Sequence, residues 1–207
     1  MPYGYSGVTP NQKVKNTGVF SVNDINALVE SGSWGGSLKL IQSQTVTSVS
    51  SVAFTSIQED EYDVHFLQAT NYQPSGNDHL VMRFYESGVI ETASVYKHAL
   101  QYGYLPHTSS GAFGENKSTG ISYLKFLPDE TSTSSRSGQG YCYIYNAGNS
   151  SKYTFATSQV FGSHTSTAFI GYFGGAVRPT ADEITQIRFY ADTDLTGTIK
   201  LFGVKQL

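Results

Sequence analysis

Hydrophobic and polar residues alternate with a period of two over most of the chain after residue 36. Such alternation is typical of β-strands that bury one face. The pattern predicts about eleven short strands with turn-rich runs between them. They span residues 38–42, 51–55, 62–66, 80–84, 95–100, 121–127, 141–145, 153–157, 168–173, 184–190 and 198–204. We therefore expect an all-β fold, an antiparallel β-sandwich of jelly-roll type, over residues 38–207.

One helical pattern precedes this region, at residues 22–30. Ser21 and Asp24 resemble a capping box, with Asp in place of the usual Glu. The apolar residues that follow fall on one helical face, and the Ser-Gly-Ser run at residues 31–33 ends the pattern. Residues 20–37 are thus predicted to form a short helix and a linker.

The first 19 residues are predicted to be an extended arm. Proline and glycine recur in them, apolar residues are sparse, and Lys13 and Lys15 are their only charges. Such a segment stays disordered or lies against a partner, because it cannot bury enough apolar surface alone. The candidate attachment residues are Lys13, Val14, Lys15, Val19 and Phe20.

A second segment without a clear strand pattern lies at residues 103–120. It contains one proline and several glycines and serines. Its length exceeds that of an ordinary connection, so it is predicted to form a protruding loop.

Composition narrows the possible partners. Only 14% of residues are charged and the net charge is −3, which provides no basic surface for phosphates, so we expect no nucleic-acid partner. No apolar run reaches the roughly 18–20 residues of a membrane span. The N-terminus lacks the pattern of a secretory signal, which predicts synthesis in the cytoplasm. The single cysteine, Cys142, excludes an intramolecular disulfide.

Motifs for catalysis or metal binding are not apparent. The five histidines are scattered, with His65 expected on the polar face of its strand, and Cys142 is expected to be a buried, inert thiol. The acids at residues 59–63 and 192–194 fit solvated turns, and Asp192 begins no complete calcium loop. Nothing selects two carboxylates as a glycosidase pair. We therefore expect no enzymatic activity, no metal and no cofactor.

Tyrosine offers the one candidate for ligand binding. Alternate tyrosines on one strand could form a platform on which sugar rings stack, although tyrosine is also a common strand former whose ring simply packs. The candidates are Tyr72, Tyr102, Tyr104, Tyr141, Tyr143 and Tyr145.

Several segments resemble β-sandwich structural proteins from the virions of tailed, marine-type bacteriophages. The final strand is similar to the run Gly-x-Ile-x-Leu-Tyr-Gly-Val-Lys common in such proteins, with Phe202 at the tyrosine position. The similar segments are residues 16–22 (NTGVFSV), 34–36 (WGG), 40–45 (LIQSQT), 50–56 (SSVAFTS), 184–189 (ITQIRF) and 197–205 (GTIKLFGVK).

This resemblance implies a non-enzymatic structural protein on the outer surface of the virion. It favours a tail-fibre or receptor-binding component, which would be a homotrimer, contact a host surface glycan or receptor, and join other virion proteins through its N-terminal arm. A head decoration (cement) or capsid-fibre protein remains an alternative, as does a freestanding carbohydrate-binding module. A lyase or hydrolase of surface glycans is disfavoured because no candidate catalytic pair emerges.

Overall fold

The structure is a computed structural model that describes residues 22–23, 25–26, 37–76, 78–130, 136–164 and 167–205. The chain divides into two compact units, residues 1–37 and 38–207. In the first unit, residues 22, 23, 25 and 26 are helical. The rest of the predicted helix and the whole predicted arm lie outside the described residues.

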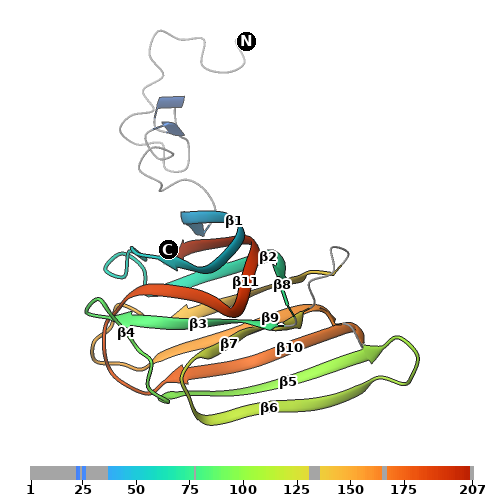
Figure 1. Ribbon diagram of the computed structural model, residues 1–207. Helices are drawn as coiled ribbons and strands as arrows, with labels where there is room; N and C mark the ends of the chain where they lie inside the picture. Colours follow the sequence, from blue (N-terminus) through green and yellow to red (C-terminus); the bar gives the residue numbers. More distant parts are fainter. Residues whose placement is uncertain are drawn as a thin grey trace, which may run out of the picture. The chain divides into compact units, whose positions relative to one another are not determined.

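The second unit is built from β-strands joined by antiparallel pairing (Figure 1). The expected all-β antiparallel fold is confirmed. The strands are β1 (Leu38–Phe54), β2 (Val64–Pro74), β3 (Asp78–Glu86), β4 (Val89–Ile90), β5 (Tyr96–Pro106), β6 (Ala112–Ile121), β7 (Leu124–Glu130), β8 (Gly138–Tyr145), β9 (Thr154–His164), β10 (Thr167–Arg178) and β11 (Ile184–Val204).

The strands form one sheet that curls into a half-barrel. Its order is β4-β3-β11-β2-β8-β9-β10-β5-β6, and β1 pairs with β11 while β7 pairs with β3. Strand β7 also contacts β9 without pairing with it, so it covers part of the inner face of the sheet. The core therefore lies between this inner face and the strands around β3 and β7.

Strand β11 belongs to both parts of this arrangement. Its first half pairs with β3 and its second half with β2, while β1 follows it along nearly its whole length. Asp78 accepts a hydrogen bond from the backbone N–H of Thr193 at 2.8 Å, at the point between the two halves. Asp192 and Asp194 therefore lie within one long strand, β11, and the turn predicted at residues 192–194 is wrong.

Several predicted boundaries differ from the structure. Residues 38–42 and 51–55 join into one strand, β1, whose register shifts accommodate the polar residues between them. The predicted protruding loop at 103–120 is wrong, because most of it forms the β5–β6 hairpin and only residues 107–111 connect the strands. A strand that glycines weaken in isolation is stabilised here by pairing along its length.

The predicted face of β2 is also wrong, although its period is right. His65 was expected to face solvent but is fully buried beside Leu67 and Ala69. Phe66 points to the opposite side, where its ring lies 5.0 Å from that of Tyr143. Both faces of β2 carry apolar side chains, so alternation alone leaves the inward face undetermined.

Candidate functional site

The outer face of strands β8, β9, β10, β5 and β6 carries a row of small side chains between larger ones. The strand register places Thr157, Gly175 and Ala99 side by side on three neighbouring strands. Tyr143 on β8 stands at one end of this row and Lys117 on β6 at the other. We call this row and the side chains beside it the transverse trough, because it crosses the strands.

Larger side chains border the small ones on both sides. Phe155 and Val177, which pair across β9 and β10, lie on one side. On the other side, Phe173 lies between Gln159 and Gln101 in the neighbouring row. Phe155 and Phe173 remain 46% and 49% exposed, so their rings are available to a ligand.

Three adjoining hollows occupy the trough. The largest measures about 460 Å³ and lies over Gly175, between Phe155 and Lys97. A second, of about 360 Å³, is lined by the β8 tyrosines and shares Thr157 with the first. A third, of about 320 Å³, reaches the β6 edge and shares Ala99 with the first. The trough is therefore an elongated surface rather than one closed pocket.

Two consecutive glycines on β10 have different roles here. A Cβ atom on Gly174 would lie 2.3 Å from the carbonyl oxygen of Ala99, and its φ of +155° further favours glycine. A Cβ atom on Gly175 would meet only the carbonyl oxygen of Ala156, at an ordinary 3.4 Å. Gly174 is thus required by the backbone, whereas Gly175 leaves the floor of the trough open.

The structure separates the six candidate tyrosines. Tyr141, Tyr143 and Tyr145 share the outer face at the β8 end of the trough, and Tyr143 stacks against Tyr145 with ring centroids 6.3 Å apart. Tyr141 donates a hydrogen bond to Gln159 at 2.7 Å. This part of the candidate set forms a continuous aromatic surface.

The other three tyrosines lie elsewhere. Tyr72 is buried in the core and offers no ring face to a ligand. Tyr102 lies on the inner side of β5, where its ring is 5.0 Å from that of Tyr172, and Tyr104 is its neighbour at 6.2 Å. They are not brought together with the β8 tyrosines.

The other aromatic residues of this face were not among the candidates predicted from the sequence. Phe155 and Phe173 border the trough, and Phe66 and Phe202 extend the β8 cluster, with their ring centroids 5.8 Å apart. The signal was present, because β9 and β10 carry large apolar residues at both odd and even positions. A half-buried strand does not need apolar residues on both faces.

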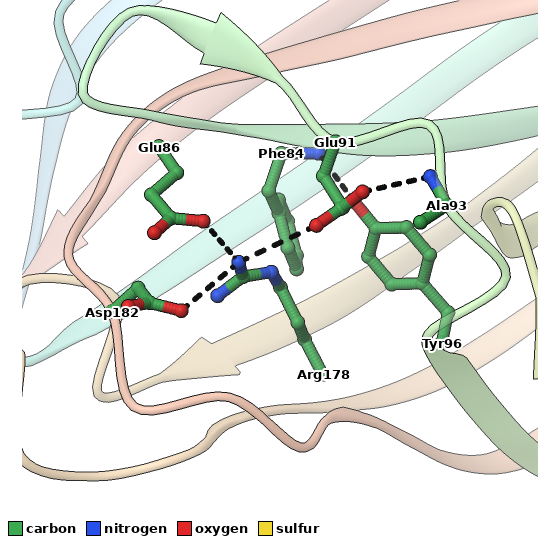
Figure 2. A network of polar contacts seen from close by, with 7 residues as sticks. All are labelled: Phe84, Glu86, Glu91, Ala93, Tyr96, Arg178 and Asp182. Carbon is green, nitrogen blue, oxygen red and sulfur yellow. Dashed lines mark hydrogen bonds and ion pairs between the residues drawn. The ribbon is translucent and has the colours of Figure 1, made fainter.

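A group of charged side chains surrounds Arg178, at the end of β10 (Figure 2). Its buried guanidinium contacts the carboxylates of Glu86, Glu91 and Asp182 through Nη2. The distances are 3.7 Å to Glu91 and 3.2 Å to Asp182, and the contact with Glu86 is closer. Glu91 also accepts a hydrogen bond from the backbone N–H of Ala93 at 2.7 Å.

This group, the Arg178 cluster, fastens the β3–β4 hairpin to the end of β10 and the loop that follows it. Nearby, Tyr96 accepts a hydrogen bond from the backbone N–H of Phe84 at 3.0 Å, and burial raises the pKa of Tyr96 to about 12. All three carboxylates turn toward one cation (Figure 2). We therefore interpret the Arg178 cluster as an ion network with a structural role.

Other titratable groups lie apart from the trough. Cys142 is buried, as predicted, and burial raises the pKa of its thiol, which keeps it protonated. His65 lies in the core with its Nε2 2.8 Å from the carbonyl oxygen of Ile57. Among the described residues, no three His, Cys, Asp or Glu side chains gather in a way that could hold a metal ion.

No known protein family, curated protein or solved structure matches this chain. Within the described part of the chain, no helix is long and apolar enough to span a membrane.

Proposed function

We propose that this chain is a non-enzymatic binding protein on the outer surface of a bacteriophage particle, and that its β-domain holds a host surface glycan in the transverse trough. The virion assignment rests on the sequence resemblance. The binding assignment rests on one observation, which is the elongated trough with exposed aromatic rings on either side of a floor of small residues.

The dimensions of the trough suit a chain-like ligand. It crosses five neighbouring strands, which lie about 4.8 Å apart, so it extends for roughly 19 Å. A ligand can lie along the trough because its floor consists of small residues, Thr157, Gly175 and Ala99, which do not project into its path. A linear polysaccharide can lie along such a surface, whereas a compact ligand would use only one of the hollows.

The side chains of the trough suit the chemistry of a sugar. The rings of Phe155, Phe173 and Tyr143 offer apolar faces to the C–H groups of a pyranose. The amides of Gln159 and Gln101 can donate to and accept from hydroxyl groups along the same row. Aromatic surfaces combined with a few polar groups are typical of ligand sites that recognise small organic groups.

The experiment is to measure binding of the full chain to an array of linear hexasaccharides, both neutral and acidic. We expect Gly175→Val to weaken binding to whichever hexasaccharide the native protein selects, because the new side chain projects from the floor into the largest hollow and holds the ligand away from the bordering rings. Valine is well tolerated in strands, so the variant should fold. Thr47→Val, an exposed change on β1, which takes no part in the trough, is the matched control and should bind as the native protein does.

Two outcomes would contradict the proposal. Native protein that binds none of the hexasaccharides, or a Gly175→Val variant that binds them as tightly as the native protein, would remove the trough as the binding surface. The virion assignment is tested separately, by imaging a purified particle at residue resolution. A chain that binds glycan but is absent from particles would instead be a freestanding carbohydrate-binding module.

A further inference from the structure

Strand β6 forms an open edge of the sheet (Figure 1). It pairs with β5 regularly from Ala112 to Ser118, and no other strand of the described residues pairs with it. Its outward backbone groups therefore lack partners in the sheet. Proteins usually protect such an edge, because unpaired N–H and C=O groups invite another strand to pair with them.

The other edge strands of the described residues carry the usual protections. β1 has three register shifts against β11, which interrupt a straight edge. β4 is only two residues long, and β7 contains Pro128, which has no N–H to donate. β6 is ten residues long and contains no proline. The one register shift of β6 lies beyond Ser118, so its edge is straight from Ala112 to Ser118. Glu115 and Lys117 are the only charges on this straight edge, and such charges oppose pairing with strands that do not complement them. A strand with complementary charges can pair there.

The charges on β6 are arranged for pairing with itself. Glu115 and Lys117 are its only charged residues, both are highly exposed on the outer face, and they lie on either side of Asn116. In an antiparallel pair of identical strands, the residues on either side of the twofold axis face one another. An axis through Asn116 therefore sets Glu115 of each copy opposite Lys117 of the other copy.

The neighbouring registers are disfavoured by the same charges. An axis through Glu115 sets two glutamates opposite one another, and an axis through Lys117 sets two lysines opposite one another. Like charges directly opposite across strands are destabilising, while opposite charges stabilise the pair. An axis between two residues would join the outer face of one copy to the inner face of the other. The register centred on Asn116 is the one in which the outer faces are continuous and the charges complementary.

The side chain of Asn116 is compatible with this axis. It points to the inner face, where its Oδ1 lies 2.7 Å from Nε2 of His98 in the same chain. It therefore needs no partner from a second copy. In the isolated chain, Glu115 and Lys117 contact one another at 2.5 Å while both remain exposed to water, so this contact contributes little to stability and can be exchanged.

We infer that two copies of this chain associate through antiparallel pairing of their β6 strands about a twofold axis at Asn116. The paired sheets place the two troughs on one continuous outer face. This association is twofold, and so it differs from the homotrimer that the sequence resemblance implies. It does not depend on glycan binding or on a place in the virion.

Charge reversal on the full chain tests this inference by sedimentation equilibrium. Glu115→Lys sets lysines against lysines across the axis, and Lys117→Glu sets glutamates against glutamates. We expect each single variant to weaken dimer formation by about tenfold or more. The double variant Glu115→Lys/Lys117→Glu restores opposite charges at both positions and should restore the native dimer.

The controls separate the cross-strand contact from other effects. The two single variants shift the net charge in opposite directions, so a change in overall repulsion cannot account for a loss in both. Lys152→Glu, in an exposed loop, changes the charge as Lys117→Glu does and should leave the dimer unchanged. A monomeric or trimeric native protein, or a double variant that fails to recover the dimer, would overturn the inference. Circular dichroism of each variant checks that the fold is retained.

Discussion

His65 shows how the surroundings of one residue set its chemistry. Its side chain is fully buried on the inner face of β2, and its Nε2–H donates to the carbonyl oxygen of Ile57 at 2.8 Å. Burial lowers the pKa of His65, because the core solvates the charged imidazolium poorly; the hydrogen bond to Ile57 opposes this shift but does not cancel it. His65 is therefore held neutral in the folded protein at neutral pH.

Stability should consequently fall as the solution is made acidic. The unfolded chain binds a proton at His65 near the ordinary histidine pKa of about 6.5, whereas the folded chain binds it only at lower pH. Stability from this group is thus fully present above about pH 6.5 and is lost as the pH falls toward the folded pKa, by at most about 1.4 kcal/mol per pH unit.

Urea unfolding between about pH 7 and pH 5 measures this slope. His65→Gln keeps a donor for Ile57 but cannot titrate, so we expect its stability to depend less on pH than that of the native protein. His107→Gln alters an exposed histidine and is the matched control, with the native slope expected. An unchanged slope in His65→Gln would show that the loss of stability arises elsewhere.

At the scale of whole elements, charged side chains help to hold strands that are distant in sequence. The Arg178 cluster joins the end of β10 to the β3–β4 hairpin, and Asp78 at the start of β3 holds the backbone of Thr193 in β11. Removing one partner of a buried ion pair leaves uncompensated charge, and so costs more than a solvent-exposed pair contributes.

We expect Arg178→Met to lower the free energy of unfolding by about 2–3 kcal/mol, below the 3–5 kcal/mol typical of a fully buried pair. The reduction arises because Glu86 and Asp182 are about one-third exposed, so water can solvate them after the change. Chemical denaturation measures the difference. Lys39→Met removes an exposed contact to Glu61 and should change stability little. Equal effects of the two variants would contradict a structural role for the Arg178 cluster.

At the scale of the whole molecule, residues 38–207 contain the entire buried core found in the described residues. If the proposed function is correct, the β-domain binds the host glycan and the N-terminal arm attaches the chain to the particle. Ordering such an arm against a virion protein opposes binding by about 1–2 kcal/mol per fixed residue, which several copies on a symmetric base can offset.

Deletion of residues 1–19 separates these two roles. We expect the shortened chain to keep its unfolding midpoint and its hexasaccharide binding, but to be lost from assembled particles. Assembly is measured by quantifying the chain in purified particles, with Lys13→Ala/Lys15→Ala as a milder variant that retains the arm. A shortened chain that enters particles as well as the full chain would place attachment on the β-domain.

The strand pattern alone determined the fold class of this protein. Period-two alternation depends on local chain geometry, so it correctly predicted an antiparallel all-β fold, the buried Cys142, and a shared face for Tyr141, Tyr143 and Tyr145. These features follow because successive side chains of a strand point to opposite faces, whatever the strand pairs with.

Only the tertiary structure decided which faces turn inward and which residues meet across strands. His65 is buried although it was expected to face solvent, because β2 is apolar on both sides and the buried residues Ile57 and Tyr62 contact its side chain on the inner one. Gly174 and Gly175 are neighbouring residues of the same type, but they have different roles. The backbone conformation requires glycine at 174, whereas glycine at 175 keeps the floor of the trough open. The trough itself depends on the register between β5 and β10, two strands far apart in sequence, and the pattern within either strand does not state which residue of the other lies opposite.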